Sequence, residues 1–276
     1  MKSLIFPFLL SLGAVCFAVL SPVLSAERGG GGGDQNAVKE APLSPVQKLV
    51  FNQFHLKNVA PGQVLHYRFE RKGLLGDDYT DKIDLLIKGG AAEARTVGFR
   101  FFSGDRRRPY QDLTEVTSNP LLVLYFNKDV WDLARRIKAR GVANYLRNRI
   151  LDGMSRAKEI TKGVCVLDGR EVPGQRIAFE PYGADENRHH LVHYSWIRYE
   201  IVLSEAVPGA LCEIRTVVPY PDEKTPAHFL AKLRKSGMFS LAEEVERVNK
   251  LTKTSAPLFV ERLVFDRLSR DGNEGD

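Results

Sequence analysis

Three segments in the first half of the chain alternate apolar and polar side chains with the period of a β-strand. They are residues 64–70, 82–88 and 95–102. In the first, Leu65, Tyr67 and Phe69 share one face of the strand, while the polar residues between them share the other. Glycine and aspartate between the segments are typical of turns. The pattern predicts a meander of antiparallel strands with one buried and one solvated face.

The period changes to that of a helix in the middle of the chain, over residues 127–154. Asn127 is suited to cap a first helix, and Gly141 separates it from a second. The apolar positions follow the helical repeat: Val130, Leu133, Ala134 and Ile137, then Val142, Tyr145, Leu146, Ile150 and Met154. The pattern predicts two linked amphipathic helices between two sets of strands.

Strand patterns return in the second half of the chain. The expected strands are residues 164–167, 175–180, 196–203, 211–218 and 258–268. Asp168 and Gly169 are expected at the turn of a first hairpin. Pro208 and Gly209 suit a type II turn in a second, because glycine tolerates a positive φ.

Further helices are expected near both ends of the folded region. Ser44 before a proline predicts the start of a short helix, because serine supplies a cap acceptor and the first turn tolerates proline. Residues 225–235 and 240–251 also have helical spacing. Ser240 with Glu243 is the pattern of a capping box at the start of the second of these helices.

The N-terminal residues have the three parts of a secretory signal peptide over residues 1–26. A basic start at Lys2 precedes an apolar run from Leu4 to Leu20, and small residues lead to Ala26. The alternative is an uncleaved membrane anchor, because the run approaches the roughly 18 residues that can cross a bilayer. The signal predicts a periplasmic or secreted protein.

The rest of the chain divides into a leader, one domain and a tail. Residues 27–43 include a glycine tract and almost no large apolar side chain, so they are expected to form a flexible leader. Residues 44–268 are expected to fold as a single α+β domain. The charged residues 269–276 are expected to be a disordered tail.

The charge of the chain indicates which partners to expect. The formal net charge of +6 is spread along the chain and suits peripheral contact with anionic lipid headgroups. Nucleic acid is not an expected partner of an exported protein.

The chain has three cysteines. Cys16 lies in the signal peptide, where lipidation is an alternative to cleavage, whereas Cys165 and Cys212 remain after cleavage. In an oxidising compartment these two form either one disulfide or two buried free thiols.

The order of the expected elements over residues 44–268 resembles that of the LolA and LolB group of periplasmic carriers. The resemblance rests on this order and on no diagnostic motif. It implies an incomplete, curved β-barrel wrapped around the central helical pair, with an apolar groove that accepts acyl chains. The helices expected within residues 225–251 depart from the simplest carrier plan. Residues 198–222, RYEIVLSEAVPGALCEIRTVVPYPD, also resemble exported bacterial proteins whose role is unassigned.

Large apolar side chains on the strands and central helices are candidates to line an apolar pocket. They are Phe69, Phe99, Phe101, Phe126, Trp131, Tyr145 and Met154. Ordinary core packing explains the same residues without a ligand. A lipid or the acyl chain of a lipoprotein is the ligand that the resemblance implies.

Arg106, Arg107 and Arg108 form the densest cationic run in the chain. Guanidinium groups bind phosphate or carboxylate through paired hydrogen bonds, so this run is a candidate site for a lipid headgroup or an acidic envelope protein. A solvated loop is the alternative, since most charge runs face water.

One cluster of residues is a candidate for metal chemistry. His189, His190 and His193 with Asp185 and Glu186 are residue types that can hold zinc. On a strand, however, His190 would point away from the other two histidines, which favours a polar loop. No serine has the glycine-flanked turn of a hydrolase, and the cysteines lack a CxxC arrangement.

Three functions follow from these patterns. The first is a non-enzymatic exported binding protein that carries or senses a lipid or lipidated partner. The second is an envelope protein-interaction module without a ligand cavity, and the third is a metal-dependent hydrolase. No cofactor is expected.

Overall fold

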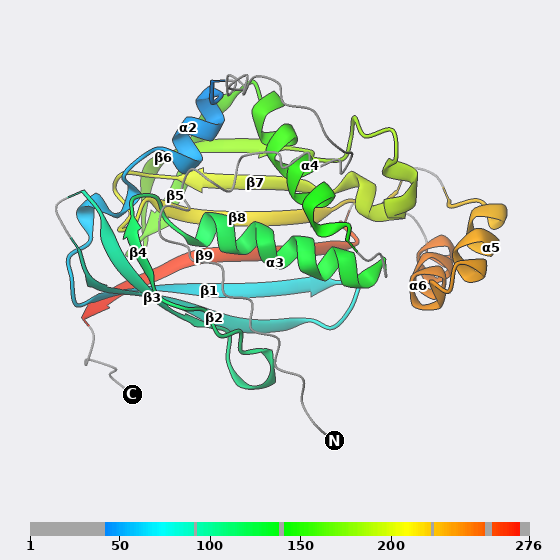
Figure 1. Ribbon diagram of the computed structural model, residues 1–276, viewed down its shortest axis with the longest axis horizontal. Coiled ribbons are helices and arrows are strands. Elements are labelled where there is room, and N and C mark those ends of the chain that lie inside the picture. Colours follow the sequence, from blue (N-terminus) through cyan, green and yellow to red (C-terminus); the bar gives the residue numbers. More distant parts are fainter. Residues whose placement is uncertain (1–41, 91–92, 138–140, 222–223, 252–255, 271–276) are drawn as a thin grey trace, which may run out of the picture.

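Strands from both halves of the chain join in one antiparallel sheet (Figure 1). The computed structural model describes residues 42–90, 93–137, 141–221, 224–251 and 256–270, and in these ranges nine strands follow the order β4-β3-β2-β1-β9-β8-β7-β6-β5. The strands are β1 Gln63–Gly73, β2 Tyr79–Gly89, β3 Arg95–Phe101, β4 Leu113–Val116, β5 Ile160–Leu167, β6 Arg170–Phe179, β7 Arg198–Leu203, β8 Leu211–Val218 and β9 Phe259–Arg270. The two edge strands, β4 and β5, do not pair, so the sheet is not closed into a barrel. The predicted signal peptide and most of the predicted leader lie outside the described residues.

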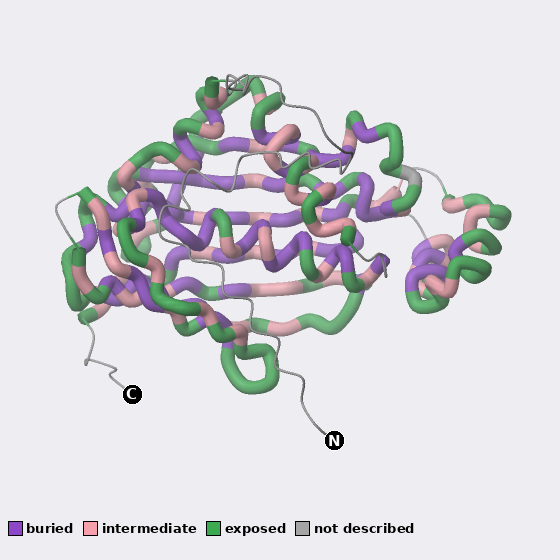
Figure 2. The backbone as a smooth tube through the Cα atoms, viewed as in Figure 1, coloured by how far each residue is buried: buried purple, intermediate pink, exposed green. Residues whose placement is uncertain are grey.

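Helices lie over one face of this sheet and beyond one of its ends (Figure 1). They are α2 Pro45–Phe51, α3 Leu121–Arg136, α4 Ala143–Arg156, α5 Ala227–Lys235 and α6 Phe239–Lys250, with short 3-10 turns η1 His55–Asn58, η2 Gly104–Arg106 and η3 Arg188–Trp196. Figure 1 shows α3 lying across the middle of the sheet and α4 on the side of β6 and β7. Figure 2 shows buried residues along the strands and along α3. We call this side of the sheet the helix-covered face.

The predicted α+β class is confirmed, and so are most of the strands. β1, β2 and β3 form the expected antiparallel meander. A two-residue turn at Asp168 and Gly169, both with positive φ, joins β5 to β6. Gly209, with φ of 73°, lies in the turn between β7 and β8. Ser44 caps α2 as expected, since its side chain accepts from the backbone N–H of Gln47.

Two predicted helix starts are wrong. α3 begins at Leu121 rather than at Asn127, which lies inside the helix. The run of apolar residues before Asn127 hides the helical period, so the start could not be recognised from spacing. The capping box of Ser240 and Glu243 is absent, because α6 begins one residue earlier, at Phe239, with Met238 in the cap position.

Two strand predictions also need correction. The short edge strand β4 was not predicted, since its four residues are too few to show alternation. The predicted disordered tail begins too early, because Ser269 and Arg270 belong to β9. They pair with Val64 and Gln63 of β1, and this pairing joins the last strand to the first in the middle of the sheet.

Candidate functional site

Aromatic rings fill the layer between α3 and the sheet. Phe126 of α3 lies 6.1 Å from Phe179 of β6 and 5.1 Å from Tyr199 of β7, measured between ring centroids. Phe179 and Tyr199 are themselves 5.4 Å apart. The rings of Phe126 and Tyr199 meet edge to face, at 90°, and such a pair contributes about 0.5–1.5 kcal/mol beyond the area that it buries. We call these three residues the aromatic floor.

The N-terminal end of α3 is held by Asn119, which is fully buried. Its side-chain amide donates to the hydroxyl of Tyr67 at 3.0 Å and to the carbonyl of Gly209 at 2.9 Å, and its Oδ1 accepts from the backbone N–H of Leu121 at 3.1 Å. The backbone N–H of Asn119 donates to Nδ1 of His55 at 3.2 Å. One side chain therefore joins α3 to β1 and to the β7–β8 turn.

A cluster of buried charges holds the middle of α3. Nζ of Lys128 lies 3.0 Å from Asp129 Oδ1 and 3.5 Å from Asp132 Oδ2, and it also donates to Glu261 of β9. Arg71 of β1 lies 3.6 Å from the other carboxylate oxygen of Glu261. Lys128 and Glu261 are 1% and 2% exposed, so these charges are solvated by their partners rather than by water. We call these five residues the charge cluster.

The charge cluster alters the acidity of its own members. Burial opposes the charge of Lys128, but the carboxylates of Asp129, Glu261 and Asp132 raise the pKa of its ammonium above the usual range. Burial and the charge of Asp129 raise the pKa of Glu261 to about 7, although Lys128 and Arg71 act in the opposite direction. Lys128 therefore stays charged near neutral pH, while Glu261 titrates there.

Further polar contacts hold α3 on its sheet side and at its C-terminal end. On the sheet side, Thr216 of β8 donates to Asp129 Oδ2 at 2.8 Å. At the C-terminal end, Arg136 donates to the hydroxyl of Tyr194 at 3.0 Å and lies 3.3 Å from Glu244 of α6. Burial raises the pKa of Glu244, but hydrogen bonds from His193 and Tyr194 and the charge of Arg136 together lower it below its usual range. Polar contacts thus fix α3 along its whole length.

Helix α4 is attached differently, through a narrow apolar stripe. Its buried residues are Leu146, Ile150, Gly153 and Met154. A Cβ on Gly153 would lie 2.7 Å from Cα of Pro181 and 3.2 Å from Cδ2 of Phe179, so only glycine allows this close approach. Side-chain hydrogen bonds join α4 to its surroundings at Tyr145 to Asp185 and at Arg147 to Asn127. A third joins Nε2 of Gln47 in α2 to the carbonyl oxygen of Leu151, at 3.4 Å. α4 therefore covers the aromatic floor with few fixed polar contacts.

The predicted pocket residues are only partly brought together. Phe69, Phe101 and Met154 are buried in the core, with at most 1% exposure, and Phe126 belongs to the aromatic floor. Phe99 and Tyr145 are partly buried, next to Tyr110 and Asp185 respectively. Trp131 is 60% exposed on the outer side of α3 and lies apart from the others. The arrangement places Met154 and Phe126 on the two helices that face β6 and β7.

The three arginines of the predicted anion site have different surroundings. Arg106 stacks over the ring of Tyr79, 4.3 Å from its centroid. Arg108 lies 3.1 Å from Asp132, so it extends the charge cluster. Arg107 is exposed, and among the described residues no ion pair reaches it. The run therefore does not present three free guanidinium groups to one anion.

The predicted histidine site lies in η3 rather than on a strand. His193 is buried and its Nε2 lies 2.8 Å from Glu244, while His190 is exposed. The side chain of His189 is outside the described part of the structure. Within the described residues, no group of three or more histidine, cysteine, aspartate or glutamate side chains is placed to hold a metal ion.

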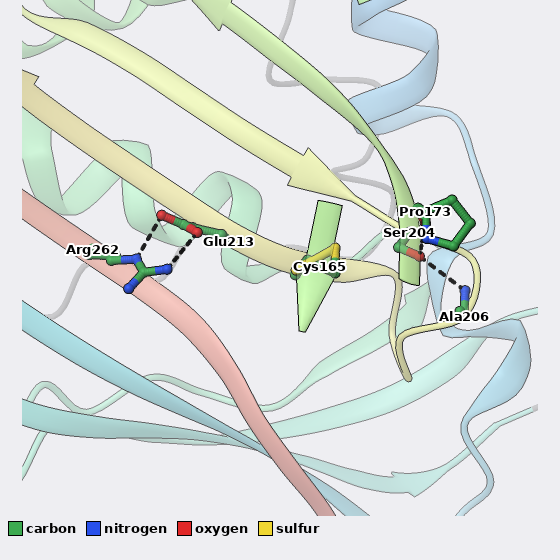
Figure 3. The surroundings of a disulfide bond; sticks show 7 residues. Cys165, Pro173, Ser204, Ala206, Glu213 and Arg262 are labelled. Carbon is green, nitrogen blue, oxygen red and sulfur yellow. Dashed lines mark hydrogen bonds and ion pairs between the residues drawn. A yellow bond between two sulfur atoms is a disulfide. The ribbon is translucent and has the colours of Figure 1, made fainter. Parts of the chain in front are cut away.

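A disulfide between Cys165 and Cys212 joins β5 to β8, with the Cα atoms 6.0 Å apart (Figure 3). The cross-strand partners Gly163 and Gly174 allow the β5–β6 hairpin to lie close to β7. A Cβ on Gly174 would lie 2.8 Å from the carbonyl oxygen of Leu203. Figure 3 also shows the ion pair between Glu213 and Arg262 beside the disulfide.

The charge cluster was missed because the residues were assigned by apolar periodicity alone. Glu261 occupies an inward position between Phe259 and Leu263 on β9, where alternation calls for an apolar residue. Asp129 follows Tyr125 by four residues, on the buried side of α3. A charged residue at a position where the periodicity calls for an apolar residue was the sign of a buried ion pair in the sequence.

The geometry defines an α+β protein in which buried polar side chains hold α3, an apolar stripe and a few hydrogen bonds hold α4, and aromatic rings lie between α3 and the sheet. The chain matches no protein-family model and no curated protein sequence. None of the helices in the described ranges is long and apolar enough to cross a membrane.

Proposed function

We propose that this protein is an exported, non-enzymatic carrier or sensor that binds an acyl chain between α4 and the aromatic floor. The observation that carries the proposal is the contrast between the two helices. α3 is held by Asn119, by the charge cluster and by Arg136, whereas α4 rests mainly on an apolar stripe. An apolar ligand can replace apolar contacts at little cost, but it cannot replace buried ion pairs.

The proposed ligand position follows from this contrast. Leu146, Ile150 and Met154 are buried on α4, and Gly153 of the same stripe lies against Phe179 of the aromatic floor. In this proposal an acyl chain entering there exchanges one apolar surface for another. The pocket-lining residues are buried in the present state, so ligand entry requires α4 to move. In this proposal the open sheet corresponds to the incomplete barrel of the LolA and LolB carriers, and the protein works in the periplasm or outside the cell.

The test is a titration with cis-parinaric acid, a fatty acid whose fluorescence rises in an apolar site. We expect saturable binding by the purified protein. Met154→Ala is expected to change the dissociation constant several-fold, because its side chain faces the proposed ligand. Trp131→Ala, on the outer side of α3, is the matched control and is expected to leave binding unchanged.

Folding must be checked in each variant by circular dichroism, since truncating a buried methionine costs about 2–5 kcal/mol. If Met154→Ala unfolds, Ile150→Val provides a milder change of the same surface. Absence of saturable binding by the unmodified protein would contradict the proposal. Equal affinities of the pocket variant and the Trp131 variant would place the ligand elsewhere.

One observation favours the second function, an envelope protein-interaction module. Val164 and Val166 of the edge strand β5 are 54% and 64% exposed, and an exposed apolar edge strand can pair with another chain. A partner recovered by pull-down should be lost with Val164→Lys/Val166→Lys. A second variant replaces Arg106, Arg107 and Arg108 by alanine. If this variant loses the partner and the β5 variant keeps it, the arginine loop is the contact.

A further inference from the structure

We infer that the α5–α6 hairpin docks the protein on a bilayer with anionic headgroups. Figure 1 shows the two helices beyond the end of the sheet, and Figure 2 shows exposed residues along α5. Leu233 of α5 and Leu241, Ala242 and Val245 of α6 are buried, so the hairpin has a small apolar core of its own. The inference does not depend on acyl-chain binding under α4.

One side of the hairpin is used to attach it to the rest of the protein. Glu244 of α6 lies 2.8 Å from Nε2 of His193 and accepts from the hydroxyl of Tyr194 at 2.8 Å. The hydroxyl of Tyr220 donates to the carbonyl of Leu251 at 2.6 Å. These contacts orient α6 toward η3, which leaves an exposed side of α5 free for a partner.

The exposed side of α5 is basic. His228, Lys232 and Lys235 follow one another at spacings of four and three residues, so they share one helix face, and all three are exposed. Among the described residues, no carboxylate pairs with Lys232 or Lys235. Arg234 differs, because it lies 2.7 Å from Glu246. The lysines therefore present uncompensated positive charge to solvent.

An exposed apolar side chain follows α5 on the same hairpin. Gly237, with φ of 74°, follows the end of α5. Its backbone N–H donates to the carbonyl oxygen of Arg234, and the backbone N–H of Met238 donates to the carbonyl oxygen of Leu233. This is the hydrogen-bond pattern of a Schellman turn, which glycine favours. The next residue, Phe239, is 57% exposed at the start of α6. A partly exposed phenyl ring therefore follows the lysine-bearing helix directly after the turn.

Exposed lysines and an exposed phenyl ring on one hairpin suit an anionic bilayer, because the charges bind headgroups while the ring enters the interface. The exposed Glu243 of α6 is the main opposing charge on the hairpin. Each basic residue near an anionic surface is expected to raise the partition coefficient about fivefold, and raised salt is expected to weaken the effect.

The test is sedimentation of the purified protein with vesicles of phosphatidylglycerol and phosphatidylcholine, compared with vesicles of phosphatidylcholine alone. We expect binding to the anionic vesicles only. Lys232→Gln/Lys235→Gln is expected to lower the partition coefficient roughly thirtyfold, and Phe239→Ser to lower it several-fold. Arg106→Gln/Arg107→Gln removes the same charge elsewhere and serves as the matched control.

Three results with vesicles would overturn the inference. They are equal binding to neutral and anionic vesicles, no loss in the hairpin variants, and an equal or larger loss in the arginine control. An acidic protein that competes with phosphatidylglycerol for the hairpin at lower concentration would also contradict a membrane partner. The hairpin variants should keep the affinity for cis-parinaric acid, which separates this inference from the proposed function.

Discussion

Lys128 shows how strongly a single residue can depend on its partners. Its ammonium group is buried among Asp129, Asp132 and Glu261, and each of these carboxylates lacks full access to water. Removing one member of a buried ion pair leaves the other charge uncompensated, which costs about 3–5 kcal/mol. The charge cluster is therefore better described as a device that fixes the position of α3 than as a source of net stability.

We expect Lys128→Ala to lower the free energy of unfolding by about 3–5 kcal/mol, measured by urea denaturation. Lys72→Ala is the control, because its side chain is 69% exposed and lies 3.9 Å from Glu70. An exposed pair of this kind contributes at most about 1 kcal/mol. Similar losses in the two variants would show that the charge cluster is not desolvated as described.

Glu261 is expected to make stability depend on pH. Burial raises its folded-state pKa from 4.5 to about 7, so the folded state binds this proton more tightly than the unfolded state. The contribution is fully present below the unfolded pKa and is lost as the pH rises through 7. As the pH rises from 4.5 to about 7, the free energy of unfolding of the unmodified protein should fall more than that of Glu261→Gln. Urea denaturation at each pH measures both.

The comparison with Glu261→Gln is needed because other carboxylates act in the opposite direction. Burial disfavours ionisation of Asp132, but Lys128 and Arg108 lower its pKa overall, so its contribution is lost as the pH falls. Both proteins contain Asp132, and its effect therefore largely cancels in the difference. Parallel pH profiles for the two proteins would contradict a raised pKa for Glu261.

At the scale of elements, the β5–β6 hairpin depends on a covalent link. The disulfide between Cys165 and Cys212 spans 47 residues. A loop of this length is expected to contribute about 4 kcal/mol through the entropy of the unfolded chain. We expect reductant to lower the free energy of unfolding by about that amount, and to have no effect on Cys165→Ala/Cys212→Ala. An equal response of both proteins to reductant would exclude the disulfide as the cause.

The elements differ in how well the sequence predicts them. The alternation of apolar and polar residues located β1, β2 and β3, because each strand has one more buried and one more exposed face. The start of α3 could not be located, since Leu121–Phe126 is apolar on every side of the helix and therefore shows no period. The length of β9 was also hidden, because Ser269 and Arg270 gain strand structure only by pairing with β1.

The candidate site was less predictable than the fold. Periodicity identified Met154 and Phe126 as apolar helix residues, but it could not distinguish them from Trp131, which faces solvent. The charge cluster depends on three elements that are distant in sequence, so no local pattern reports that Lys128 meets Glu261. Contacts of this kind arise only when the sheet order is known.

At the scale of the whole molecule, the proposed function requires a part that stays fixed and a part that moves. The fixed part is the sheet with α3, held by Asn119 and the charge cluster. The movable part in our account is α4, which covers the aromatic floor through apolar contacts. The α5–α6 hairpin adds a basic surface at one end of the sheet, where a membrane would be met.

Hydrogen exchange, measured with and without palmitate, tests whether an acyl chain binds beneath α4. We expect backbone amides of α4 to exchange faster than those of α3 in the free protein, because fewer polar contacts hold α4. Palmitate is expected to slow exchange in α4 and in β6 and β7, and to leave the charge-cluster turn of α3 unchanged. Equal exchange of the two helices, or no change in α4 with palmitate, would contradict an acyl-chain site beneath α4.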